Sequence, residues 1–143
     1  MSFGGMNYAA VLLAAVASFL FGGVWHGAFS RRALARTAEG ERRKSQLRTQ
    51  QFRVDAVPFI IAFVALLVMA YVLAGVVGNL GAGQVTLRNG VISALFVWAG
   101  FVMTSLVVNH TVEGVGGIAT LMDAGHWLGV LVIQGAVIGW LGA

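Results

Sequence analysis

The sequence predicts an all-α, polytopic membrane protein whose four transmembrane helices form one bundle. Hydrophobic residues make up 59% of its 143 residues and charged residues 10%, against roughly 45–50% and about 25% in an ordinary soluble domain. A globule this small has too large a share of its surface facing water to hide so many apolar side chains. The composition therefore excludes a soluble enzyme, a disordered tail and a DNA-binding domain.

Four apolar runs, at about residues 6–25, 56–77, 91–108 and 124–141, contain no Asp, Glu, Lys or Arg. About 20 helical residues cross a hydrocarbon core of roughly 30 Å. In lipid a helix satisfies its own backbone, whereas an isolated strand does not. We therefore predict four membrane-spanning helices within a single domain, residues 1–143.

The first run has no Lys or Arg before it, so it lacks the positively charged start of a signal peptide and is predicted to be a retained helix. Small residues recur along it at every fourth position: Ala10, Ala14, Ser18 and Gly22. Residues at this spacing lie on one face of a helix and let a neighbouring helix approach closely.

A basic loop at about residues 30–54 separates the first two runs and holds eight of the nine Lys and Arg residues. Lys and Arg loops stay in the cytoplasm, so both chain ends are predicted on the opposite side. Its side chains are candidates for contact with anionic lipid headgroups. The candidates are Arg31, Arg32, Arg42, Arg43 and Lys44. Asp55 and Pro58 are typical of a helix start and predict that the second helix begins here.

The last two runs carry two further signals. Trp98 lies near the middle of the third run, away from the interfaces where tryptophan is usual. The fourth run contains Gly125-x-x-x-Gly129 and Gly135-x-x-x-Gly139. These glycines predict close helix packing, either inside the monomer or against a second copy or another membrane subunit.

The predicted topology brings polar residues together near the cytoplasmic boundary. They are His26, Asn109, His110, Glu113, Asp123 and His126, which include every histidine in the chain. His110 and Glu113 are three residues apart, as are Asp123 and His126. Each pair shares a helix face if its helix continues through it.

Three interpretations of this polar cluster remain open. It caps helices and tethers loops, or it forms a small-ligand or proton-handling site, or its three histidines hold a metal ion or haem. Three histidines and a carboxylate are suitable zinc ligands, but their spacing matches no local metal motif, and no cofactor is predicted. The chain has no cysteine, which excludes disulfides and thiolate sites.

The order of several short motifs resembles a family of small bacterial membrane proteins known as domain of unknown function 1761. The motifs are Asn7-Tyr8, residues 22–25, residues 69–74, residues 98–101, Asn109-His110 with Glu113, and residues 123–127. The resemblance implies four transmembrane helices in a bacterial inner membrane and no established activity. The chain has His26 where an aromatic residue is expected, so the resemblance favours Asn109, Glu113, Asp123 and Gly125 as family-wide functional residues.

The sequence thus leads to one main hypothesis and two alternatives. The main hypothesis is a non-enzymatic membrane protein that acts by association, as a homo-oligomer or as an accessory subunit of a larger membrane complex. It has the lipid bilayer and other membrane subunits as partners and no nucleic acid. The alternatives are a small transporter or channel built from several copies, and a metal- or haem-binding protein that uses His26, His110 and His126.

Overall fold

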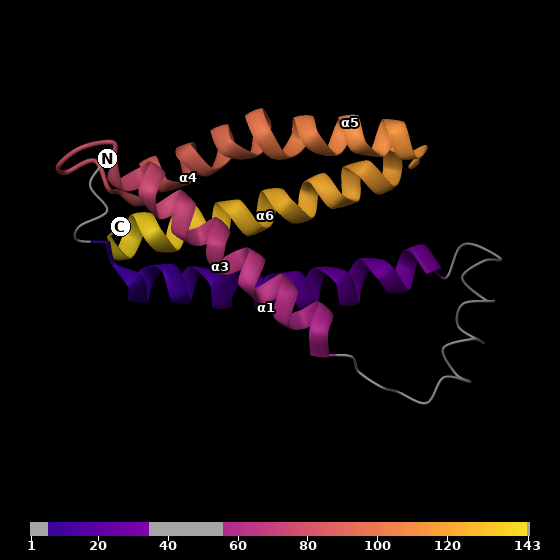
Figure 1. Cartoon of the computed structure of the whole chain (residues 1–143), viewed down its shortest axis with the longest axis horizontal. Helices are drawn as coiled ribbons and strands as arrows, with labels where there is room; N and C mark the ends of the chain where they lie inside the picture. Colours follow the sequence, from indigo (N-terminus) through magenta and orange to yellow (C-terminus); the bar gives the residue numbers. More distant parts are fainter. Residues whose placement is uncertain (1–5, 35–55, 143) are drawn as a thin grey trace.

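The computed structural model describes residues 6–34 and 56–142, and this part of the chain contains four helical spans and no strand (Figure 1). The first two spans are α1 (Tyr8–Leu34) and α3 (Ala56–Gly78). The third is one continuous helical rod made of α4 (Leu87–Val97), a π-helical turn η1 (Trp98–Val102) and α5 (Met103–Glu113). The fourth is α6 (Gly117–Leu141). All four are long and apolar enough to cross a membrane, which confirms the predicted fold class.

The helices are longer than the apolar runs that predict them. α1 continues to Leu34, α4 begins at Leu87, and α6 begins at Gly117, before the run at 124–141. Hydropathy marks only the part of a helix that lies in hydrocarbon, whereas backbone hydrogen bonds carry the helix on until a cap ends it. Arg31 and Arg32 therefore belong to the last turn of α1. Arg42, Arg43 and Lys44 lie outside the described residues.

A glycine makes the sharp reversal between α5 and α6. Gly114 has φ of +70°, in the left-handed region that favours glycine. The Val115 N–H donates to the carbonyl of His110 at 2.8 Å, and the Gly114 N–H donates to that of Thr111. This pair of bonds is the Schellman arrangement that ends many helices. The turn brings the end of α5 against the start of α6. Because α5 runs to Glu113 and α6 begins at Gly117, each predicted polar pair lies within one helix.

α6 is the central helix of the bundle, with α1, α3 and the third span packed around it (Figure 1). Its buried side chains include Leu131 and Ile138, which join residues of α1, α3 and α4 in one apolar core. At the end of the bundle away from the α5–α6 turn, the Asn7 side chain donates to the Leu141 carbonyl at 3.1 Å and so ties the start of α1 to the end of α6. The start of α1 and the end of α6 consequently lie at the same end of the bundle (Figure 1).

The closest helix contact joins α4 to α6 through backbone alone. A Cβ atom added to Gly90 would overlap the carbonyl of Gly135, and one added to Gly139 would overlap the carbonyl of Thr86. The other two glycines of the predicted stripes face α1: a Cβ atom on Gly129 would meet the ring of Phe21, and one on Gly125 would meet that of Trp25. All four glycines of the predicted stripes therefore face helices of the same chain.

Candidate functional site

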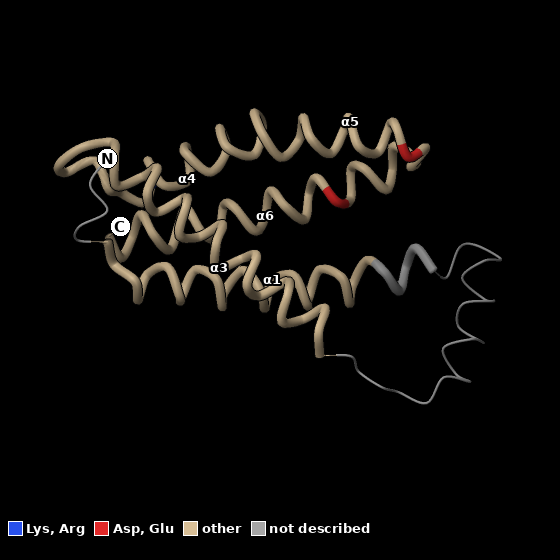
Figure 2. The backbone as a smooth tube through the Cα atoms, viewed as in Figure 1, with Lys and Arg blue, Asp and Glu red and all other residues tan. Residues whose placement is uncertain are grey.

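The structure divides the predicted polar cluster into two pairs and two separate side chains. His26 of α1 lies beside His126 of α6, with ring centroids 4.7 Å apart. His110 of α5 lies beside Asp123 of α6, with Nε2 and Oδ2 3.7 Å apart. Asn109 and Glu113 are exposed on α5 and make no hydrogen bond with another described residue. Figure 2 shows the described acidic residues near the turn between α5 and α6.

The pair at the α5–α6 end has local hydrogen-bonding partners. The Nδ1 atom of His110 is 3.0 Å from the Thr120 hydroxyl, a good hydrogen-bond distance whichever group donates. The hollow beside it, about 500 Å³, is lined by these two residues, by Thr111 and by apolar and glycine residues. Because Nδ1 of His110 is bonded to Thr120 and its Nε2 atom lies 3.7 Å from Asp123, both on α6, these contacts fit the structural interpretation of tethering α5 to α6.

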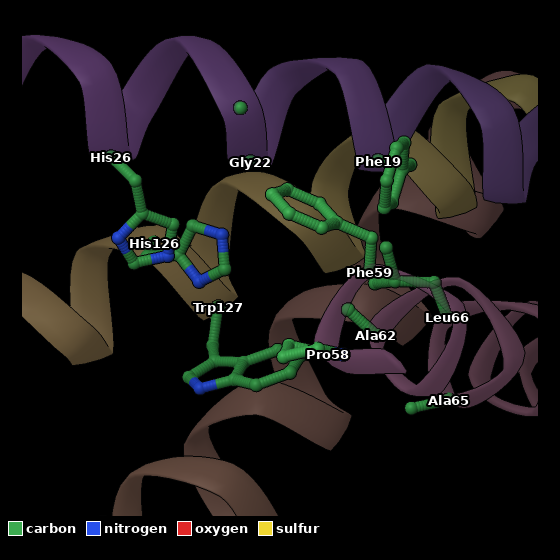
Figure 3. Close-up of a pocket in the computed structure, with 11 residues that line it drawn as sticks. Phe19, Gly22, His26, Pro58, Phe59, Ala62, Ala65, Leu66, His126 and Trp127 are labelled. Atoms are coloured by element: carbon green, nitrogen blue, oxygen red, sulfur yellow. The ribbon is translucent and has the colours of Figure 1, made fainter. Parts of the chain in front are cut away.

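The pair on α1 and α6 lies in a pocket of a different kind (Figure 3). The pocket has a volume of about 450 Å³ and is formed by the last part of α1, the first turns of α3 and the first half of α6. Apart from His26, His126 and Trp127, its walls are aromatic, aliphatic, proline and glycine. The other lining residues are Phe19, Gly22, Gly23, Pro58, Phe59, Ala62, Ala65 and Leu66. The pocket thus joins two imidazole rings to an apolar chamber.

Aromatic rings hold His126 in place. Phe21 stacks on it nearly in parallel, with centroids 6.1 Å apart and planes at 9°, and Trp25 and Trp127 flank it. Its Nε2 atom is buried and has no hydrogen-bond partner among the described residues. A buried polar atom without a partner costs free energy, so it is either a tolerated defect or an atom that meets a ligand.

The faces of α1 and α6 that carry His26 and His126 also meet at a second polar contact, further along both helices. His26, Gly22 and Ser18 follow one another at four-residue spacing on α1, and His126, Val130 and Gln134 do so on α6. The Gln134 amide donates to the Ser18 hydroxyl at 3.1 Å and to the Leu66 carbonyl at 3.0 Å. Its Oε1 atom is buried without a partner. Both unpartnered buried side-chain atoms of the described chain therefore lie on this one face of α6.

The predicted small-residue stripe of α1 lies along this contact. Ala14 and Ser18 are fully buried, and the Ser18 hydroxyl donates to the Ala14 carbonyl at 2.8 Å. A Cβ atom on Gly22 would lie 3.2 Å from the Nε2 atom of His126. The stripe therefore places α1 against α6 and keeps the ring of His126 close to the α1 backbone.

Sequence reasoning missed Gln134, Gly90 and the contribution of α3 to the pocket. An amide inside an apolar run is a signal for Gln134, because such a group needs a partner in lipid. Gly90 lies just before the third apolar run, so its packing role is visible only once the helix is known to begin at Leu87. The pocket residues Pro58 and Phe59 depend on how α3 crosses the bundle, which no local pattern reports.

The histidines do not assemble as the metal alternative requires. Among residues 6–34 and 56–142, no three His, Asp or Glu side chains lie together in a way that could hold a metal ion. His26 and His126 share the pocket, whereas His110 bonds to Thr120 outside the pocket lining.

These features define the fold class as that of a multi-pass membrane protein, because the described residues form four apolar helical spans, three of them packed around the fourth, α6. A family model described as "Protein of unknown function (DUF1761)" matches residues 9–139, and the chain belongs to that family. No curated protein and no solved structure is significantly similar to it. The resemblance drawn from the motifs is thereby confirmed, while the function has to be argued from the site.

Proposed function

We propose that the chain is a non-enzymatic membrane protein that holds a small amphiphilic molecule between α1, α3 and α6. The observation that supports the proposal is an apolar pocket lined by His126, whose buried Nε2 atom has no hydrogen-bond partner among the described residues. Ligand pockets commonly combine an apolar lining with a few polar groups that orient the ligand. No carboxylate or hydroxyl side chain lines this pocket beside the histidines, which favours binding over catalysis.

The proposed setting is a bacterial inner membrane with both chain ends outside the cytoplasm. Eight of the nine positive charges lie between the first two spans, and such segments stay in the cytoplasm. The pocket is formed by the last part of α1 and the first turns of α3. This orientation puts it in the cytoplasmic half of the bilayer, within reach of molecules dissolved in the inner leaflet.

Photolabelling of the full chain in liposomes tests the proposal. Hexadecanol that carries a diazirine in its chain is expected to label pocket residues such as Phe59 and Trp127. Ala62→Phe places a large ring into the pocket from α3 and is expected to reduce that labelling severalfold. Val68→Phe on the same helix is the matched control, because Val68 is exposed and lies outside the pocket. Uniform labelling of exposed faces that Ala62→Phe leaves unchanged would contradict the proposal.

We propose self-association through α5 as a second function, which keeps the homo-oligomer hypothesis but moves its interface. Only 6% of the most apolar stretch of the third span is buried, against 28%, 33% and 39% in the other spans. Ser105 and Asn109, one turn apart on α5, are exposed and make no hydrogen bond with another described residue. An amide both donates and accepts, so Asn109 can pair with Asn109 of a second copy.

The double variant Ser105→Ala with Asn109→Leu is expected to weaken self-association about tenfold, because interhelical hydrogen bonds in membranes contribute roughly 0.6–1.7 kcal/mol each. Energy transfer between labelled chains in liposomes, measured over a range of lipid dilutions, reports the change. Val108→Leu, at an exposed neighbouring position, is the control. Unchanged energy transfer in the double variant would exclude this interface, and recovery of an unrelated subunit in place of a second copy would support the accessory role instead.

A further inference from the structure

We propose that the pocket selects a neutral amphiphile with a hydroxyl head, which lies beside the rings of His26 and His126 while its apolar chain lies among Phe19, Phe59 and Leu66. This inference rests on the proposed binding function and names the chemical class of its ligand. It is carried by the unpartnered Nε2 atom of His126 and by the absence of charged residues from the described lining.

Hydrogen-bonding chemistry favours a hydroxyl. A neutral imidazole has one donor nitrogen and one acceptor nitrogen, and Nε2 of His126 is one or the other according to its tautomer. A hydroxyl both donates and accepts, so it satisfies Nε2 in either tautomer. Ether and ester oxygens only accept, so they serve one tautomer alone. The ring of His26, centred 4.7 Å from that of His126, offers the same hydroxyl a second partner.

The charges around the pocket favour a neutral head. None of the described lining residues is Lys, Arg, Asp or Glu. The described carboxylate nearest along α6 is Asp123, three residues before His126, and its negative charge disfavours an anionic head. Transfer of an unpaired ionised group into an apolar site is costly. The pocket therefore discriminates against a carboxylate or phosphate even when the attached chain is the same.

The shape of the site fits a small head on an apolar chain. Because Gly22 has no side chain, the α1 backbone lies close to the Nε2 atom, which a Cβ atom there would approach to 3.2 Å, so only a small head fits beside it. Apolar residues of α1 and α3 line the part of the pocket beyond the histidines (Figure 3). The volume of about 450 Å³ lies in the range of small-molecule sites.

Three photoprobes with identical diazirine chains test the head group on the full chain in liposomes: hexadecanol, its methyl ether and hexadecanoate. Loss of one hydrogen bond from a buried partner corresponds to about a tenfold change in binding. We therefore expect hexadecanol to label the pocket about tenfold more than the ether, with the carboxylate also weaker than the alcohol. His126→Leu is expected to abolish the preference, and His126→Gln to retain part of it, because an amide also donates and accepts. His110→Leu, outside the pocket lining, is expected to leave it unchanged.

The outcomes distinguish a failure of the hydroxyl inference from a failure of the proposed binding function on which it rests. Equal labelling of the pocket by all three probes, or a preference for the carboxylate, overturns the hydroxyl inference and leaves the binding function standing. Absence of pocket labelling by every probe overturns both. The comparison of probes on the unaltered chain needs no variant, so it decides the question even if His126→Leu does not fold. A preference that His110→Leu abolishes as well would also overturn the assignment to His126.

Discussion

Replacing Gly135 by leucine is expected to separate α4 from α6 and to lower the free energy of unfolding by about 3 kcal/mol or more. Overpacking a core typically costs about 1–3 kcal/mol when flexible side chains can move aside. Here an added Cβ atom would overlap the carbonyl of Gly90 and lie 2.9 Å from Cβ of Ala94. Backbone atoms cannot rotate away, so the two helices must move apart and the core around Ile138 opens with them.

Unfolding by sodium dodecyl sulfate, followed by circular dichroism in mild detergent micelles, measures this change. Gly100→Leu is the matched control, because it makes the same substitution in the third span where an added Cβ atom meets nothing within 4 Å. Gly90→Ala tests the other side of the same contact and is expected to be destabilising too. Equal midpoints for Gly135→Leu and Gly100→Leu would show that α4 and α6 are not packed backbone against backbone.

The glycine stripe of α6 has two interpretations, packing inside the monomer and packing between two copies. The way in which the loss of stability depends on protein dilution distinguishes them. Gly135 meets Gly90 of the same chain, so the loss of stability should not change with the ratio of protein to detergent. A contact between two copies would make the loss depend on that ratio by mass action. We therefore expect the four stripe glycines, Gly125, Gly129, Gly135 and Gly139, to serve the fold of the monomer, and self-association to use another surface such as α5.

Hydropathy was sufficient to predict the fold because the bilayer requires long apolar helices and little else. It could not predict the helix ends. Thr86 caps α4 by accepting the Asn89 N–H at 3.2 Å, and Gly114 ends α5 through its left-handed backbone. Both residues lie outside the apolar runs, so the hydropathy pattern is silent about them.

The topology also predicted which ends of the helices meet, and therefore the layer in which the histidines lie. The topology could not predict which residues of that layer pair with each other, because the pairs depend on how each helix is rotated and how the helices cross. Trp98 illustrates the difficulty. Its indole donates to the Ala124 carbonyl at 2.9 Å from the first residue of a π-helical turn, and such turns rotate the residues that follow them. Neither the π-helical turn nor the rotation of α5 can be derived from spacing along the sequence.

Two substitutions of Gln134 are expected to have different effects on the free energy of unfolding. Gln134→Ala removes the whole side chain from a site with 0% exposure and is expected to cost about 2–4 kcal/mol, as in other large-to-small core changes. Gln134→Leu keeps most of the volume. It loses the bonds to Ser18 and Leu66, which average roughly 0.6 kcal/mol each in membranes. It also removes the unpartnered Oε1 atom, whose burial costs about 1–3 kcal/mol. The leucine variant should therefore be as stable as the unaltered chain or slightly more so.

The same detergent titration measures both variants, with Ser18→Ala reporting the loss of one partner alone. If leucine proves as destabilising as alanine, the amide bonds rather than the volume hold α1, α3 and α6 together, and Oε1 has a partner. If leucine is neutral, the glutamine is not there for stability. A residue that the fold does not need, on the same face of α6 as His126 and bonded to the backbone of the pocket residue Leu66, then acts by positioning the wall of the pocket, which it does not itself line. In that case Gln134→Leu should lower pocket labelling by the hexadecanol probe without unfolding the chain, which no purely structural role of Gln134 would produce.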